Sequence, residues 1–304
     1  MPLLSPAAPR RHALVARLVL LPALLAVAVS ATLAPAGSAA PSGTSPSGAL
    51  RYVALGDSYS AATGVLPLVP TAPPRCLRSS RNYPSLIAEA TGARLTDVTC
   101  GAADTDDFKN SQGEGIDPQL DAVTRRTDLV TMTIGGNDSS VFINSIVQCG
   151  AAALTTAGTG SPCKDTYGKE FVRTVRRTTL PSLKKALRAV HRKAPRAEVA
   201  ILGYPRILPP KVGCYPQMPV ARGDVPYLFN LQRVLNNVVR RAARATDSVY
   251  VDVPRRSRGR DACQPLGKRW VEPVLLGTNP VIVHPNARGE AAMARITMRR
   301  LGLR

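Results

Sequence analysis

The stretch RYVALGDSYS, residues 51–60, places a short apolar run directly before a Gly-Asp-Ser turn. An apolar run that ends at a glycine is typical of a buried strand. Leu129–Ile134 repeats the pattern before Gly-Gly-Asn-Asp, and Arg94–Thr99 is a further expected strand that ends at Cys-Gly-Ala-Ala. Because parallel strands end at one edge of a sheet, we expect the polar turns after these strands to lie together.

Helical patterns separate the apolar segments. Apolar residues recur at intervals of three to five through the basic segment 172–193, as in an amphipathic helix. We expect further helices at 83–91, 117–124, 225–245 and 286–301, and further strands at 199–202 and 249–251. Strands that alternate with helices predict an α/β fold with a small parallel sheet of about five strands, covered on both faces.

Residues 1–40 have the layout of a secretory signal peptide. Three arginines precede the apolar stretch 18–36, and small residues follow as far as Ala40. The Pro-, Ser- and Gly-rich segment 41–50 predicts a flexible mature N-terminus, and the about 260 residues that remain, 51–304, suit a single domain. We therefore expect a secreted, extracellular protein. An uncleaved membrane anchor and twin-arginine export through Arg10-Arg11 are alternative interpretations.

The chain is strongly basic, with 40 Lys and Arg against 20 Asp and Glu and a net charge of +20. The basic residues are scattered and aromatic residues are few, so we expect no nucleic-acid partner. An exported basic protein has anionic lipid or anionic cell-wall polymer as its natural surface contacts. A solvated arginine-rich surface explains the same composition, and we expect a monomer.

Six cysteines follow the signal, and none belongs to a C-x-x-C pair, which argues against zinc and dithiol redox chemistry. An even number of cysteines in an exported chain predicts disulfides. Six cysteines permit fifteen pairings, and their spacing alone does not choose among them.

Ser58 is the candidate nucleophile, although a serine at this place also suits a helix N-cap. A serine nucleophile needs a base within hydrogen-bond reach. The chain has three histidines: His12 leaves with the signal, and His191 lies among Lys and Arg. His284 is therefore the candidate base, with a purely structural histidine as the alternative. No G-x-S-x-G elbow is present, which argues against the α/β-hydrolase fold.

Acyl transfer also needs donors aimed at the developing oxyanion. We expect these to be the backbone N–H of Ser58, the backbone N–H of Gly101 and the side-chain amide of Asn137. Each of these is an ordinary turn residue when considered alone. Their common position after predicted strands is what indicates a site.

With these four residues the chain resembles the SGNH (GDSL) hydrolases. Gly56-Asp57-Ser58 resembles block one of that family, Gly101 block two, Gly135–Asp138 block three and His284 block five. The resemblance implies a flavodoxin-like three-layer α/β/α sandwich and a serine esterase that needs no metal or organic cofactor. The chain is most similar to secreted three-disulfide actinobacterial lipases and esterases, whose cysteines pair sequentially. That likeness implies the pairs Cys76–Cys100, Cys149–Cys163 and Cys214–Cys263.

One departure from the family pattern concerns the base. The family's D-x-x-H would place an aspartate at Val281, and the nearest acid upstream of His284 is Glu272. Some members of the branch use a main-chain carbonyl instead, so we expect the Val281 carbonyl to orient His284. Asp252 or Asp261 could alternatively complete a triad from a distance.

These expectations describe a secreted hydrolase of carboxylic esters, with lipid acyl esters as substrate. The apolar, Pro-rich loops 66–75 and 207–225 are candidates to line an acyl cleft. If the protein is an enzyme of another specificity, the alternative is a carbohydrate or cell-wall O-deacetylase. A catalytically weak wall-binding module is the alternative outside the enzymes. A nucleotide-binding protein is disfavoured because no phosphate-cradling glycine loop is present.

Overall fold

The computed structural model describes residues 48–304; the expected signal peptide, and the expected flexible segment apart from residues 48–50, lie outside the described residues. Five parallel strands form one sheet in the order β2-β1-β3-β4-β5. Their bounds are β1 Arg51–Gly56, β2 Arg94–Asp97, β3 Leu129–Thr133, β4 Glu198–Leu202 and β5 Val249–Val251. After β1 the chain moves to one side for β2 and then to the other for β3, so the β1 and β3 ends form a switch point, where α/β sheets build their sites.

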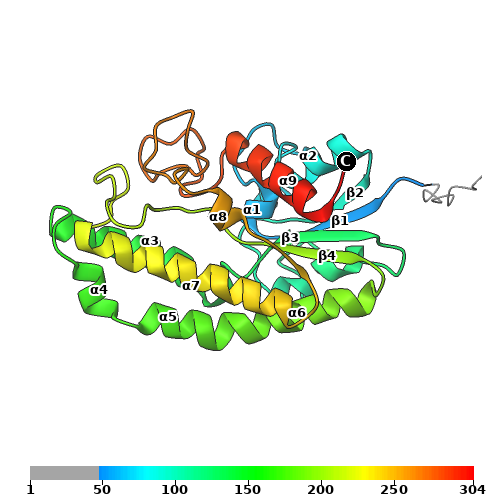
Figure 1. Ribbon diagram of the computed structural model, residues 1–304, viewed down its shortest axis with the longest axis horizontal. Coiled ribbons are helices and arrows are strands. Elements are labelled where there is room, and N and C mark those ends of the chain that lie inside the picture. Colours follow the sequence, from blue (N-terminus) through cyan, green and yellow to red (C-terminus); the bar gives the residue numbers. More distant parts are fainter. Residues whose placement is uncertain (1–47) are drawn as a thin grey trace, which may run out of the picture. The chain divides into compact units, whose positions relative to one another are not determined.

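Helices cover both faces of the sheet, as the alternation predicted. Tyr52 and Ala54 of β1 face α2 (Tyr83–Thr91) and α9 (Ala287–Leu301), and they pack with Ile87 and Met293 in one apolar cluster. Val53 and Leu55 face the opposite side, toward α6 (Leu180–Lys193) and α7 (Val225–Arg244). Because side chains alternate along a strand, both faces of β1 are buried. Figure 1 shows the resulting three layers, with α2 and α9 on one side of the strands and α6 and α7 on the other.

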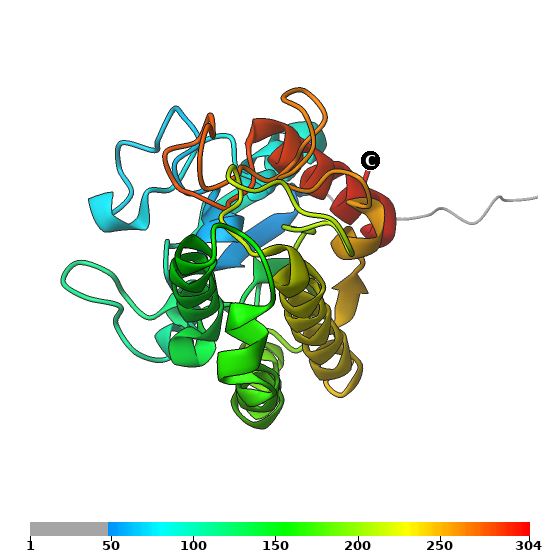
Figure 2. The same cartoon turned by 90° about the vertical axis from the view of Figure 1, so that its left-hand side faces the viewer.

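The remaining helices lie in the connections. They are α1 Ser58–Ala61, α3 Val141–Thr155, α4 Pro162–Tyr167, α5 Glu170–Thr174 and α8 Val253–Arg256. Short 3₁₀ turns occur at Pro74–Cys76, Asp106–Phe108, Gln119–Ala122, Asp138–Ser140 and Arg222–Asp224. In Figure 2 the loops after the strands and the segment between α8 and α9 gather at the end that faces the viewer.

The segment 172–193 differs in detail from the single regular helix expected there. It consists of the end of α5, a π-helical stretch at Val175–Thr179, and α6. Pro181 has no N–H, so it cannot donate to the carbonyl of the residue four positions earlier. A wider turn before the proline accommodates this missing hydrogen bond.

Three disulfides join the cysteines in sequential pairs, which confirms the pairing implied by the resemblance: Cys76–Cys100, Cys149–Cys163 and Cys214–Cys263. The first ties the 3₁₀ turn at Pro74–Cys76 to the segment that follows β2. Within residues 48–304 no helix has both the length and the apolar character needed to cross a membrane.

Candidate active site

The turn between β1 and α1 presents Ser58. Gly56 has φ +121°, and a Cβ at this position would lie 2.3 Å from the Thr133 carbonyl oxygen, so only glycine permits the close passage of β1 and β3. Asp57 caps α1, its carboxylate accepting from the N–H of Tyr59 at 3.0 Å. Because Asp57 performs the capping, the Ser58 hydroxyl is left for another partner.

That partner is His284. Its Nε2 lies 2.7 Å from the Ser58 Oγ, across a sequence separation of 226 residues. The alternative of a purely capping serine is therefore disfavoured by geometry. His191 lies elsewhere, half-buried on α6, with its Nε2 2.8 Å from the Ser248 hydroxyl.

The expected orienting carbonyl was wrong by one residue. The His284 Nδ1 lies 2.7 Å from the carbonyl oxygen of Ile282, not of Val281. Val283 adopts φ +54°, a left-handed conformation that is rare for a β-branched residue. This turn places the carbonyl two positions before the histidine, rather than three, against the ring. No simple spacing rule shows such a turn in the sequence.

Neither distant aspartate completes a triad. The Asp252 carboxylate accepts from the N–H of Arg255 at the start of α8. The Asp261 carboxylate accepts from the N–H of Cys263 and lies 3.4 Å from the Gln264 amide. Glu272 supports the His284 segment without contacting its ring: its N–H donates to the His284 carbonyl at 2.9 Å.

Burial shifts the pKa of two groups at this site. It lowers the pKa of His284, because a charged imidazolium loses hydration there, and the hydrogen bond to Ile282 acts in the opposite direction. It raises the pKa of Asp57 to about 6, although hydrogen bonds from Tyr204, Thr133 and the backbone oppose this rise. The structure thus favours a neutral imidazole, which is the form that can accept a proton.

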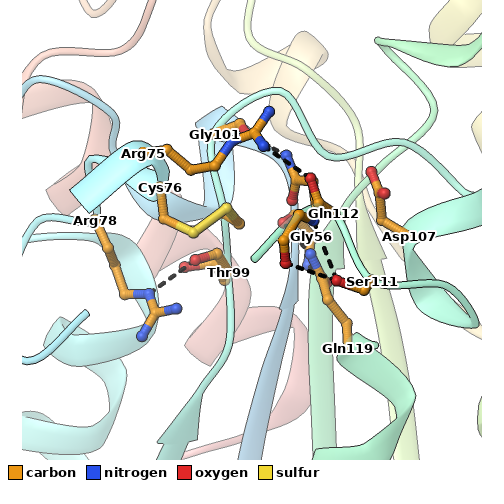
Figure 3. The surroundings of a disulfide bond; sticks show 12 residues. Gly56, Arg75, Cys76, Arg78, Thr99, Gly101, Asp107, Ser111, Gln112 and Gln119 are labelled. Atoms are coloured by element: carbon orange, nitrogen blue, oxygen red, sulfur yellow. Dashed lines mark hydrogen bonds between the residues drawn. A yellow bond between two sulfur atoms is a disulfide. The ribbon is translucent and has the colours of Figure 1, made fainter. Parts of the chain in front are cut away.

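The structure contradicts the expectation for Gly101. Its N–H donates to the Cys76 carbonyl at 3.0 Å and is not available to a substrate. The next N–H, of Ala102, donates no hydrogen bond to any residue of the described part of the chain. The Gly101 carbonyl, at the other end of the same peptide, accepts from Gln112 Nε2 at 2.6 Å, so the Ala102 N–H points away from Gln112 (Figure 3).

The turn at Ala102 explains why sequence reasoning chose the neighbouring residue. Ala103 N–H bonds the Cys100 carbonyl, and Ala102 has φ +63°, as at the third position of a type II turn. Gly101 was expected because it follows the second strand and resembles block two of the family, whereas the left-handed position, which glycine usually takes, belongs to Ala102. Asn137 lies as expected beside this turn, with its Nδ2 donating to the Ala103 carbonyl at 2.9 Å.

Two tyrosines belong to the site although the sequence analysis did not select them. Tyr59 packs its ring 5.0 Å from that of His284. The Tyr204 hydroxyl donates to Asp57 at 2.5 Å and accepts from the N–H of Gly136 at 2.8 Å. Tyr204 thus connects the turn of Ser58 to the turn of Asn137. Both tyrosines carry a sequence signal: Tyr59 follows Ser58 directly, and Tyr204 follows Gly203 at the end of the predicted strand 199–202.

A cavity of about 430 Å³ opens onto Ser58 and His284. Beyond the polar groups its wall is apolar, formed by Phe142, Ile143, Ile146 and Leu235. Phe142 and Ile146 also line a second, smaller cavity of about 30 Å³. The loop 207–225, expected to line an acyl cleft, contributes to this second cavity through Ile207, Leu208, Met218, Pro219 and Val220. The other expected loop, 66–75, contributes only Arg75, which lines the catalytic cavity.

The described residues 48–304 contain no group of three His, Cys, Asp or Glu side chains close enough together to hold a metal ion. The arrangement at Ser58 is that of an acyl-transfer site, with a hydroxyl and an imidazole in contact at the mouth of an apolar cavity that Ala102 and Asn137 also line.

Comparisons with known proteins agree with this chemistry. Residues 54–292 match the GDSL-like lipase/acylhydrolase family. Lipase 2 of Streptomyces coelicolor is 55% identical over 267 residues, which cover 87% of this chain and 90% of that protein. A lipase of Streptomyces rimosus is 31% identical and covers 80% of this chain and 83% of its own.

Among solved structures, phospholipase A1 from Streptomyces albidoflavus NA297 has a TM-score of 0.68 and 27% identity, covering 83% of this chain and 100% of that one. The extracellular lipase of Streptomyces rimosus gives the same values. These likenesses confirm the sandwich fold expected from the alternation of strands and helices. The chain belongs to the GDSL-like lipase/acylhydrolase family and is a carboxylic ester hydrolase.

Proposed function

We propose that this protein is a secreted enzyme that hydrolyses acyl esters of lipids. The observation that carries the proposal is the 2.7 Å contact between Ser58 Oγ and His284 Nε2 at the mouth of an apolar cavity. The signal-like residues 1–40 and the three disulfides support secretion. The relatives named lipase and phospholipase A1 support a lipid substrate.

In the proposed reaction the Ser58 oxygen attacks the ester carbonyl while His284 Nε2 takes the hydroxyl proton. The Ile282 carbonyl accepts the Nδ1–H throughout, which keeps the free Nε2 directed at Ser58. The tetrahedral intermediate collapses, the bond to the leaving alcohol breaks, and His284 returns the proton to that alcohol. Water then repeats the same steps on the acyl-enzyme and releases the carboxylic acid.

The oxyanion of both tetrahedral intermediates needs hydrogen-bond donors that are not already bonded to an acceptor of the protein. We assign the backbone N–H of Ser58, the backbone N–H of Ala102 and the second Nδ2 hydrogen of Asn137. The first hydrogen of Asn137 bonds the Ala103 carbonyl and fixes the amide beside Ala102. In this site a carbonyl replaces the aspartate of a catalytic triad and supplies no full negative charge to stabilise the imidazolium. The oxyanion donors therefore contribute a larger share of the stabilisation of the transition state.

The acyl chain of the substrate is assigned to the apolar wall along α3. Phe142 and Ile146 separate the catalytic cavity from the smaller cavity beyond it. A chain that passes these two side chains would lie on the residues of the loop 207–225. Burial of apolar surface contributes roughly 0.8 kcal/mol for each methylene group, so this geometry favours long acyl groups over acetyl.

The test is turnover of p-nitrophenyl esters from acetyl to palmitoyl by the oxidised mature chain, beside Ser58→Ala. We expect activity that increases with chain length and disappears in the variant. A maximum at acetyl would instead identify a deacetylase. Residual activity in folded Ser58→Ala would refute the nucleophile, and no activity on any ester would favour a binding module.

A further inference from the structure

A second cavity, lined by arginines, lies between α7 and α8 beside the edge strand β5. It encloses about 370 Å³. We call it the arginine groove; its basic side chains are Arg206, Arg233, Arg240, Arg255 and Arg258. Apart from Gln232, which also lines the smaller apolar cavity, its lining residues belong to neither cavity described above. It is therefore a separate concave surface with a strongly positive lining.

Within the described residues, no arginine of the groove forms an ion pair. The four ion pairs within residues 48–304 join other residues. Residues 1–47 contain no Asp or Glu. The one acid in the lining is Asp252, whose carboxylate accepts from the N–H of Arg255 and caps α8. The groove therefore contains five guanidinium groups and one carboxylate, and the lining has a large excess of positive charge.

One pair of arginines in the groove, Arg206 and Arg258, shows like-charge repulsion. The pKa of Arg206 is lowered, first by burial and then by the charge of Arg258, while Asp261 and Asp252 compensate only in part. An anion bound in the groove would relieve this repulsion. Like charges held together around a cavity are typical of a binding site for a ligand of opposite charge.

Two of the guanidinium groups are held in place before any ligand binds. Arg206 lies over the ring of Phe229 at 5.3 Å and donates from Nε to the Pro254 carbonyl at 3.1 Å. Arg240 lies over the ring of Tyr250 at 6.0 Å and donates to the side-chain oxygen of Asn237. Stacking on an aromatic ring leaves the edge of a guanidinium open, and preorganised donors lose less entropy when they bind.

We propose that the arginine groove binds a phosphate group, carried either by a soluble phosphate ester or by the headgroup of an anionic phospholipid. Phosphate offers several acceptor oxygens around one centre, which matches forked donors arriving from different elements better than a single carboxylate does. Arg206 and Arg258 come from the β4–α7 connection and from the segment after α8, while Arg233 and Arg240 come from α7 itself.

The groove is connected with the catalytic site through one residue. Asn236 lines the groove, and its side-chain amide bonds both the main-chain N–H and the carbonyl of Tyr204, at 2.7 and 3.1 Å. Tyr204 in turn lines the catalytic cavity. The two sites are therefore neighbours separated by the chain segment that follows β4.

The test measures binding in the Ser58→Ala background, so that no vesicle is hydrolysed and the result does not depend on the proposed function. Inorganic phosphate and glycerol 3-phosphate are titrated calorimetrically at low ionic strength. The test variant is Arg255→Gln/Arg258→Gln, because both side chains are exposed and donate no side-chain hydrogen bond within the described residues. The matched control, with the same change in net charge, is Arg188→Gln/Arg192→Gln on the exposed face of α6.

We expect the groove variant to bind at least tenfold more weakly than the Ser58→Ala protein, and the control variant to bind equally well. Sedimentation with phosphatidylcholine vesicles, with and without phosphatidylglycerol, distinguishes the two sources. Binding that requires both phosphatidylglycerol and the groove arginines identifies a lipid headgroup. Binding of glycerol 3-phosphate alone identifies a soluble ester. Equal losses in the two variants, or no binding of any of these ligands, would overturn the proposal.

Discussion

The hydroxyl group of Tyr59 donates a hydrogen bond to the main-chain carbonyl of Val283, joining the residue after Ser58 to the residue before His284. Val283 has φ +54°, and a left-handed conformation costs a residue with a side chain roughly 1–2 kcal/mol. The hydrogen bond from Tyr59 opposes that cost. The same ring packs against His284. Tyr59 therefore acts on the base through the turn that places the Ile282 carbonyl.

The first prediction concerns this contact. Tyr59→Phe keeps the ring and removes the hydroxyl, so Val283 loses its partner and the imidazole becomes less well oriented. We expect kcat to fall about tenfold with little change in KM, which corresponds to about 1.4 kcal/mol in the transition state. Steady-state kinetics on one p-nitrophenyl ester measures this.

The control for Tyr59→Phe is Tyr83→Phe. Tyr83 is also fully buried, but its hydroxyl lies 3.2 Å from Ser60 Oγ and does not bond the histidine turn. We expect kcat within about twofold of the parent here. Equal losses of kcat in the two variants would show that removing any buried tyrosine hydroxyl lowers activity to the same extent, and would refute a specific role for the Tyr59 hydroxyl.

The second prediction is that activity needs no distant aspartate. Asp252→Asn/Asp261→Asn should retain kcat within about twofold, because the Nδ1 of His284 already has the Ile282 carbonyl as acceptor. Asp252 caps α8, and asparagine caps a helix about as well as aspartate, so the change at this cap should alter the free energy of unfolding little. A hundredfold loss of kcat, in protein shown by circular dichroism to be folded, would restore the triad.

The third prediction separates two neighbouring amides. Replacing Ala102 by lactic acid turns its N–H into an ester oxygen and removes one proposed oxyanion donor, so kcat should fall by ~10²–10³. Asn137→Ala should cost a similar factor. The matched control is glycolic acid at Gly101, which removes the bond to the Cys76 carbonyl. That change should lower the free energy of unfolding by about 1 kcal/mol and should reduce kcat less than the change at Ala102 does. A larger loss of kcat at Gly101 than at Ala102 would show that Gly101 supplies the oxyanion donor.

The fourth prediction is a pH dependence. Burial lowers the pKa of His284 below its ordinary value of 6.5, so the neutral, active form persists as pH falls past that value. The acidic limb of kcat/KM should therefore have its midpoint below pH 6.5. In mature His191→Gln protein His284 is the only histidine, so its titration by nuclear magnetic resonance is unambiguous. A limb that does not coincide with this titration would mean that another group, such as Asp57 with a pKa of about 6, controls the rate.

The fifth prediction concerns acyl-chain length. Ile146 lines both apolar cavities, so Ile146→Trp should place a bulky ring where a long acyl chain would have to pass from one to the other. We expect palmitoyl turnover to fall at least tenfold relative to acetyl turnover. Val147→Trp on the same helix is the control, because Val147 is 60% exposed and lines neither cavity. An unchanged ratio in Ile146→Trp would place the acyl chain elsewhere.

Much of the fold could be predicted because its signals are local. Each strand from β1 to β5 lies within two residues of the predicted ranges. The central strand β3 is fully buried and therefore mostly apolar, whereas the edge strand β2 is partly exposed and mixes polar with apolar residues. The helix at Tyr83–Thr91 begins after Asn82, whose side chain caps it, and ends before Gly92. The π-helical stretch before Pro181 was not predicted, because one turn of π-helix and one turn of α-helix require nearly the same spacing of apolar residues.

The sequence by itself determined which residues carry chemistry: one serine after a buried strand, one histidine left by elimination, and an asparagine after the neighbouring strand. Side-chain type and position after a strand are properties of short segments, so they can be read without coordinates. Tertiary structure alone decided which backbone groups serve them. The Ile282 carbonyl and the proposed donor, the Ala102 N–H, both lie at left-handed turns, at Val283 and Ala102, and the Val283 turn bonds the distant Tyr59. Every residue has the same carbonyl, and nearly every residue the same N–H, so only the fold determines which of them faces the substrate.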